Sequence, residues 1–120
     1  MNILDLVNEH FGFLVADRGY EMLSHLYDSA AFGNFIVIYR RGDIWLKLIR
    51  DRSQIFVEFS NDGELWKDKE SILEAQGISK ERYSIDDMNL WSGYEIENQG
   101  VDLRKHLDLI EKNIISEGAA

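Results

Sequence analysis

Histidine is the first residue type to test for chemistry, because its side chain both binds metals and moves protons near neutral pH. The chain has three, at His10, His25 and His106. A helical zinc site needs two histidines about four residues apart and a third ligand nearby, and none of these three has that spacing. His106 follows Asp102 by four residues, which would place both side chains on one face of a helix. We interpret them as a surface charge pair.

Carboxylates are the next candidates, because acid–base catalysis uses two of them in different environments. The chain has 22 Asp and Glu residues, so neighbouring pairs arise by chance. The pairs allow three interpretations: a catalytic dyad, a solvated surface, or a surface that recognises a cationic partner. They are Asp86 with Asp87, Glu95 with Glu97, and Asp62 with Glu64.

Other catalytic signatures are absent from the sequence. There is no cysteine, no GxSxG motif that would activate a serine, and no glycine-rich phosphate loop. One basic cluster, Arg50-Asp51-Arg52, either clamps an anionic ligand or forms salt bridges across a turn and fixes strand register. The sequence therefore predicts no catalytic residue, no metal site and no cofactor.

Aromatic side chains are the remaining signal, because Trp and Tyr combine a large apolar area with a polar edge. For Trp45 and Trp66, ordinary packing is favoured, either in the core or half-buried. In the segment DDMNLWSGYEIE the aromatics stand among acids, as a surface that binds a basic protein requires. The predicted partner-binding residues are Asp86, Asp87, Trp91, Tyr94, Glu95 and Glu97, with Glu58, Asp62 and Glu64 as outer candidates.

Net charge limits the class of partner. Thirteen Lys and Arg residues against 22 acids give a net charge of −9, which repels nucleic acid and anionic lipid and attracts basic proteins. Acidic proteins also carry such charge merely for solubility. No apolar stretch approaches the ~20 residues of a membrane helix, and the first residues lack the basic region of a signal peptide. A soluble cytoplasmic protein is expected, without nucleic-acid or membrane partners.

The most regular stretch is FGNFIVIYRRGDIWLKLIRDRSQIFVEF, residues 32–59. Apolar and polar residues alternate in three runs joined by short links, which predicts an antiparallel meander. Gly42 in RRGD tolerates the positive φ of a tight turn. One face should be the buried core face; the other is mixed, with Trp45, Lys47, Phe56 and Glu58.

The residues before this meander predict a helix and one further strand. Residues 3–14 have helical apolar spacing, and Gly12 can end that helix early. Residues 20–28 fit a helix or a strand, and the flanking turn signals favour the strand. The meander is therefore expected to have three to four strands.

The residues after the meander predict C-terminal helices. Residues 69–76 form a short helix with Asp68 as N-cap. Residues 79–100 are expected to be mostly irregular, and the last helix follows Asp102 as N-cap and ends at Gly118. The predicted fold is a single α+β domain over residues 1–120.

Five short motifs of this sequence resemble those of a known group of proteins: F-x-F-L (11–14), F-G-N (32–34), V-I-Y (37–39), R-D-R-x-Q (50–54) and W-x-D (66–68). They resemble small bacterial proteins, some of them similar to immunity proteins encoded beside polymorphic or contact-dependent growth-inhibition toxins. These motifs consist of packing and turn residues, so the resemblance implies a shared fold more than a shared partner. Immunity proteins of this kind bind and block a toxin, in many cases a basic nuclease domain.

The resulting hypothesis is an immunity-type inhibitor, not an enzyme, that binds a cationic toxin domain through acids and aromatics. Two alternatives stay open. The chain could be a small-molecule-binding protein or minor enzyme, with Arg50, Arg52 and a pocket between sheet and helices. It could also be a structural module that forms a homodimer through an open sheet edge or the face that carries Trp45.

Overall fold

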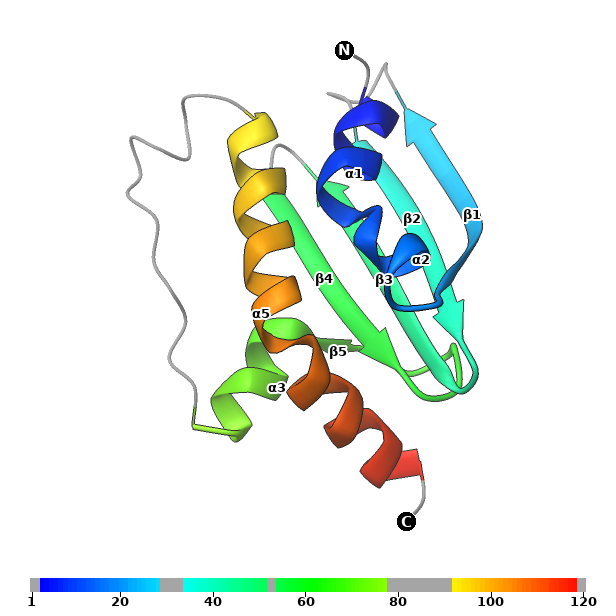
Figure 1. Ribbon diagram of the computed structural model, residues 1–120, viewed down its shortest axis with the longest axis vertical. Helices are drawn as coiled ribbons and strands as arrows, with labels where there is room; N and C mark the ends of the chain where they lie inside the picture. The colour runs from blue at the N-terminus through cyan, green and yellow to red at the C-terminus, as the bar shows by residue number, and fades with distance from the viewer. Residues whose placement is uncertain (1–2, 29–33, 52–53, 78–91, 119–120) are drawn as a thin grey trace.

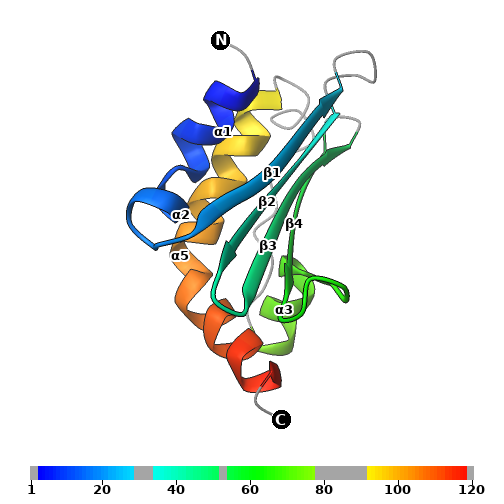
Figure 2. The same cartoon turned by 90° about the vertical axis from the view of Figure 1, so that its right-hand side faces the viewer.

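The computed structural model describes residues 3–28, 34–51, 54–77 and 92–118, and it confirms the α+β class. A five-stranded antiparallel sheet, in the order β1-β2-β3-β4-β5, forms one layer (Figure 1). Helices α1, α2 and α5 cover one face of it, as the side view in Figure 2 shows. In chain order the elements are α1 (Ile3–Phe11), α2 (Phe13–Ala16), β1 (Glu21–Asp28), β2 (Asn34–Arg41), β3 (Ile44–Asp51), β4 (Gln54–Ser60), β5 (Lys67–Asp68), α3 (Lys69–Ala75) and α5 (Ser92–Gly118).

The sheet is a meander in which alternation decides which side chains are buried. Tyr39 lies opposite Leu46, and Leu46 opposite Phe59, and all three face the helices with at most 1% exposure. The turn between β2 and β3 has Gly42 at φ 58°, as the RRGD motif predicts. The strand predicted over residues 20–28 is confirmed as β1. The two-residue strand β5 raises the count to five, one more than the predicted maximum.

The N-terminal helix and the short helix after the sheet agree with their predicted bounds. α1 ends at Phe11, immediately before Gly12, and α3 spans Lys69–Ala75. Asp68 occupies the N-cap position of α3, but its side chain makes no capping hydrogen bond. α3 contacts both β4 and α5, so it lies at the β5 end of the sheet beside the C-terminal helix (Figure 1).

The C-terminal helix corrects the prediction at its start. α5 begins at Ser92, so residues 92–100, expected to be irregular, are helical. Asp102 lies inside this helix and is not an N-cap. Its carboxylate instead contacts the ammonium of Lys69, an ion pair between segments that local sequence patterns do not reveal.

A gap in the apolar pattern of α5 coincides with a close contact to the backbone of α1. Ile96 and Leu103 are fully buried, but the inward positions between them hold Gln99 and Gly100. A Cβ at Gly100 would lie 2.7 Å from the carbonyl oxygen of His10. Because the backbone of α1 lies this close to α5 at Gly100, a glycine fits there and a larger apolar residue does not.

A buried carboxylate fastens α5 to one end of the sheet. Glu111 is 6% exposed, and its Oε2 accepts a hydrogen bond of 2.8 Å from the hydroxyl of Tyr20. Arg18 Nη2 lies 2.7 Å from Oε1 of Glu111, and Arg41 Nη2 lies 2.5 Å from Oε2. Arg18 also contacts Asp108, and hydrogen bonds to Asp108 and Glu111 raise the pKa of its guanidinium. Two cations are thus directed onto the helix.

A buried lysine fastens α3 to α5. Lys69 is 0% exposed; its ammonium contacts Asp102 and lies 3.0 Å from Oε1 of Glu70. A buried ammonium requires such partners, because an unpaired charge in the interior costs several kcal/mol. His106 Nε2 lies 3.6 Å from Oδ1 of Asp102, so the predicted pair forms. Its side chains are only 15% and 13% exposed, so it is not the surface pair expected.

Candidate partner-binding surface on the open face of the sheet

The sheet face opposite α1 and α5 carries a row of apolar side chains. The registers Leu26↔Ile36, Ile36↔Ile49 and Ile49↔Phe56 place four residues side by side across four strands. Leu26 is 72% exposed, Phe56 39% and Ile36 37%. Contiguous exposed apolar side chains are a mark of interaction surfaces. We call Leu26, Ile36, Ile49 and Phe56 the apolar row.

Carboxylates border the Phe56 end of this row. Glu58 follows Phe56 by two residues on β4, so both point to the same face, and Glu58 lies opposite Asp68 of β5. Burial, then the nearby charge of Glu70 and a smaller effect of Glu58 raise the pKa of the Asp68 carboxyl. Lys47 Nζ lies 3.6 Å from Oε1 of Glu58. We call Glu58, Asp68 and Glu70 the acidic border.

Two tryptophans hold cations farther along the same face. The guanidinium of Arg40 lies 4.5 Å from the ring centroid of Trp45, and Nζ of Lys47 lies 4.2 Å from that of Trp66. Gly63 passes over Trp45, where a Cβ would lie 3.2 Å from the ring, and its φ of +78° also favours glycine. Both rings are half-buried, as the sequence favours, and both make cation–π contacts within the molecule.

The loop after β4 is organised by Asp62, one of the predicted outer candidates. Oδ1 of Asp62 accepts hydrogen bonds from the backbone N–H groups of Glu64, at 2.8 Å, and Leu65, at 3.0 Å. The hydroxyl of Ser60 also donates to it, at 2.9 Å. These bonds, the backbone ones first, lower the pKa of the Asp62 carboxyl. Asp62 is exposed, yet one of its oxygens is already used in the loop.

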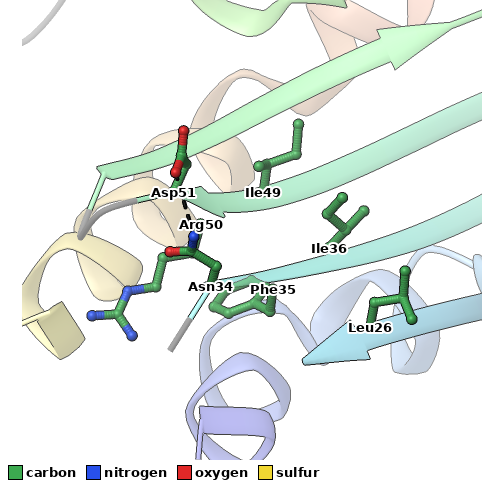
Figure 3. A pocket seen from close by; sticks show the side chains of 7 residues that line it. All are labelled: Leu26, Asn34, Phe35, Ile36, Ile49, Arg50 and Asp51. Carbon is green, nitrogen blue, oxygen red and sulfur yellow. Dashed lines mark hydrogen bonds between the residues drawn. The ribbon is translucent and has the colours of Figure 1, made fainter. Parts of the chain in front are cut away.

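A groove of about 640 Å³ lies at the end of the sheet where β2 begins and β3 ends. Three residues of the apolar row form one wall, and Asn34 and Asp51 stand at its polar end, as Figure 3 shows. Asn34 Nδ2 donates to Oδ1 of Asp51 at 3.4 Å. The groove is lined by Leu26, Asn34, Phe35, Ile36, Ile49, Arg50 and Asp51.

The groove bears on the small-molecule alternative. Leu26, Ile36 and Ile49 point away from the helices, so the groove opens at the outer face of the sheet rather than between sheet and helices. Arg50 belongs to it, but its guanidinium points away from the apolar wall (Figure 3). Arg52, the second predicted cation, lies outside the described residues.

The predicted partner-binding residues separate into three groups. Asp86, Asp87 and Trp91 lie outside the described residues. Tyr94 and Glu95 belong to the first turns of α5, and the structure describes their backbone but not their side chains.

Four predicted acids can be placed, and they do not form one surface. Glu97 is exposed on α5, on the helical side of the molecule. Glu58 belongs to the acidic border, while Asp62 and Glu64 are exposed in the loop after β4. Of these four, Glu58 alone lies beside the apolar row.

The residues that sequence reasoning missed are the apolar row itself. The alternation in residues 32–59 already places Phe56 on the mixed face, and Ile36 and Ile49 on the side opposite the buried one. Their alignment across four strands depends on register, which fixes cross-strand neighbours but follows from turn geometry and core packing together. Leu26 was hidden because its strand was ambiguous with a helix.

Comparison with protein-family models, curated proteins and solved structures finds no match to this chain. The described residues contain no group of three or more His, Cys, Asp or Glu side chains that could hold a metal ion. Within the same residues, no helix is both long and apolar enough to span a bilayer. The resemblance to immunity-type proteins therefore stays a prediction from the sequence.

Proposed function

We propose that this chain is an immunity-type binding protein of the bacterial cytoplasm that attaches to a cationic toxin domain and blocks it. The partner in this proposal is a basic protein such as a toxin nuclease domain, and the chain itself performs no catalysis. Acidic and aromatic side chains provide the contact, with electrostatic steering that speeds association and a few desolvated anchors that slow dissociation.

The distribution of exposed charge carries this proposal. Among the residues whose side chains the structure describes, exposed acids outnumber exposed bases by more than two to one, whereas the whole chain has 22 acids to 13 bases. The exposed acids are Asp5, Glu9, Asp17, Glu21, Asp43, Asp51, Asp62, Glu64, Glu74, Glu97 and Asp108. The exposed bases are Arg40, Lys67, Arg104, Lys105 and Lys112.

The internal ion pairs raise this ratio, because they take cations and carboxylates off the surface together. Arg18 and Arg41 are directed onto the buried Glu111, and Lys69 onto Asp102, so three cations serve to hold the helices. Most of the described acids have no such inward position and remain at the surface. The exposed side chains that the structure describes therefore keep six more negative than positive charges, with few cations among them, and a diffusing partner meets a negative potential.

The small-molecule alternative draws its support from the groove at the end of the sheet. Its volume of about 640 Å³ lies within the range of ligand sites, ~300 to 1,000 Å³. Ligand sites, however, usually bury most of their ligand in a largely apolar pocket with a few converging polar groups. This groove is open, one of its walls is the outer face of the sheet, and Asn34 donates a hydrogen bond to Asp51 at its polar end.

Co-expression with a candidate toxin tests the proposed function. The candidate is a basic domain encoded by the reading frame next to this gene, with growth as the readout. We expect the chain to restore growth and to bind the purified domain with an association rate that falls markedly between about 50 mM and about 500 mM salt.

Charge reversal supplies the variants for this test. Changing Asp86→Lys and Asp87→Lys together should weaken binding and protection, whereas Glu74→Lys, which changes an exposed acid on α3, should have the smaller effect of a distant charge. Two results together would contradict the proposal: the chain does not restore growth, and its association rate changes neither with salt nor with either charge reversal.

A further inference from the structure

We infer that the apolar row is the docking site for an amphipathic helix of the basic partner, with a Lys or Arg of that helix seated on the acidic border. This inference rests on the proposed function, because it names the segment of a basic protein that the open face receives. The apolar row supplies the area that becomes dehydrated, and the acidic border fixes the direction of the helix.

The row runs across the strands, which determines the shape of what fits on it. Four neighbouring strands at about 4.8 Å spacing make the row roughly 14 Å long. Apolar side chains at positions i, i+4, i+7 and i+11 of a helix cover about 16 Å at 1.5 Å per residue. One face of a helix of about three turns therefore matches the row from Leu26 on β1 to Phe56 on β4.

The need to satisfy the occupant's own backbone hydrogen bonds favours a helix over an extended segment. The open face presents side chains, while the backbone groups of β2 and β3 are already paired with neighbouring strands. An extended segment lying across the row would leave its own N–H and C=O groups unpaired against apolar atoms. A helix satisfies these groups internally, so it avoids that cost.

Charge complementarity selects a basic occupant. The Phe56 end of the row adjoins Glu58, Asp68 and Glu70, where Lys47 is already shared between Glu58 and Trp66. The ammonium of Lys69 is fully buried, where it contacts Asp102 and lies 3.0 Å from Oε1 of Glu70. The three carboxylates of the border outnumber the two ammonium groups beside them, so a cation added next to Phe56 would meet negative charge there.

The same charges disfavour a second copy of this chain as the occupant. Each copy carries a net charge of −9, so two copies brought face to face repel each other. Two acidic borders would also lie close to a common apolar contact. A basic helix avoids both costs and gains from the acids that a second copy would oppose.

The test uses three synthetic peptides of about 14 residues against the full chain. The first contains leucines at i, i+4, i+7 and i+11 and lysines elsewhere. The second has the same composition with leucines in strict alternation, so that a helix scatters them. The third replaces every lysine of the first with glutamate. We expect the first to bind most tightly and the third not to bind.

Substitutions on the row separate apolar docking from general attraction to an acidic protein. Ile36→Ser and Phe56→Ser should each weaken the first peptide about ten-fold, whereas Leu65→Ser, which removes an equally apolar and 78% exposed side chain off the row, should leave affinity within about two-fold. Glu58→Gln and Asp68→Asn should reduce the salt dependence of binding.

A thiol provides a direct readout of the site. The chain has no cysteine, so Ile36→Cys and Leu65→Cys each create a unique reactive group. The first peptide should slow alkylation of the thiol at position 36 and leave that at position 65 unchanged. Equal protection at both positions would overturn docking on the row.

The outcomes keep this inference distinct from the proposed function. If the serine variants bind the first peptide as well as wild type does, the row is not the docking site, while the proposed function still stands on the toxin experiment. If light scattering shows a dimer that Ile36→Ser dissolves, a second copy occupies the row and the inference is overturned. If neither the peptides nor the toxin domain binds, both proposals fail.

Discussion

Two buried tyrosines should respond in opposite ways to the same substitution, because one hydroxyl is paired and the other is not. Tyr20 is 2% exposed and donates a hydrogen bond of 2.8 Å to Glu111. Tyr39 is 1% exposed, and its hydroxyl finds no hydrogen-bond partner among the described residues. Changing Tyr20→Phe and Tyr39→Phe removes one oxygen from each site and leaves the ring in place.

The expected free energies follow from the partners of each oxygen. A hydrogen bond to a charged acceptor contributes about 1.5 to 3 kcal/mol, and Glu111 keeps its two arginines, so Tyr20→Phe should cost about 1.5 kcal/mol. Burial of an unpaired hydroxyl costs about 1 to 3 kcal/mol, so Tyr39→Phe should be neutral or stabilise by about 1 kcal/mol. The two variants should differ by roughly 1.5 to 2.5 kcal/mol.

Urea unfolding followed by circular dichroism measures this difference. Both variants should keep the wild-type slope against urea. In thermal unfolding, their melting temperatures should lie about 6 to 10 °C apart at about 4 °C per kcal/mol. If Tyr39→Phe costs as much as Tyr20→Phe, the hydroxyl of Tyr39 has a partner in solution and the reasoning is refuted.

Alkaline pH gives an independent check on Tyr39. Burial raises its pKa from 10.0 to about 12, so the folded chain keeps a proton that the unfolded chain releases. Stability is therefore unaffected below pH 10.0, falls as pH rises from there, and has lost roughly 2 kcal/mol from this group by about pH 12. Burial and the hydrogen bond to Glu111 raise the pKa of Tyr20 as well. Tyr39→Phe should remove its own part of this alkaline loss, and Tyr20→Phe should leave that part in place.

Three further substitutions test the contacts of the helices. Asp68→Asn should raise the free energy of unfolding slightly at neutral pH in a urea titration, because burial and the charge of Glu70 raise the pKa of this carboxyl; equal or lower stability would contradict it. Lys69→Met should lower it by about 3 kcal/mol, because Asp102 loses its buried ammonium; a neutral result would show that water replaces the lysine. Gly100→Ala should lower the melting temperature, at a cost of about 1 to 3 kcal/mol, because its Cβ would lie 2.7 Å from a carbonyl of α1; an unchanged value would mean that the helices can separate.

The sheet could be predicted from the sequence because its information is local. Alternation over residues 32–59 identifies the strands, and short links such as the turn at Gly42 pair them with their neighbours. The burial of Tyr39, Leu46 and Phe59 then follows from which face is the more apolar. The fifth strand was missed because two residues carry no periodicity.

The start of α5 could not be predicted from the same kind of pattern. The helical spacing of apolar residues in α5 is interrupted where this helix contacts α1, because Gln99 and Gly100 stand there in place of larger apolar residues. Asp102 then resembles an N-cap, since it precedes the first uninterrupted apolar period. The partner of Asp102 in the structure is Lys69, which lies on another helix, and helical spacing cannot predict such a long-range pair.

The candidate surface shows the same division between local and long-range information. Counting acids in the sequence identifies the sign of the protein's field, but not the face on which it is strongest. That depends on which cations fold inward, and Arg18, Arg41 and Lys69 do so because Glu111 and Asp102 meet them from α5. The cations that hold the helices in place are therefore not available at the surface. Carboxylates such as Glu58 remain there, beside an apolar row whose side chains are brought together by strand register.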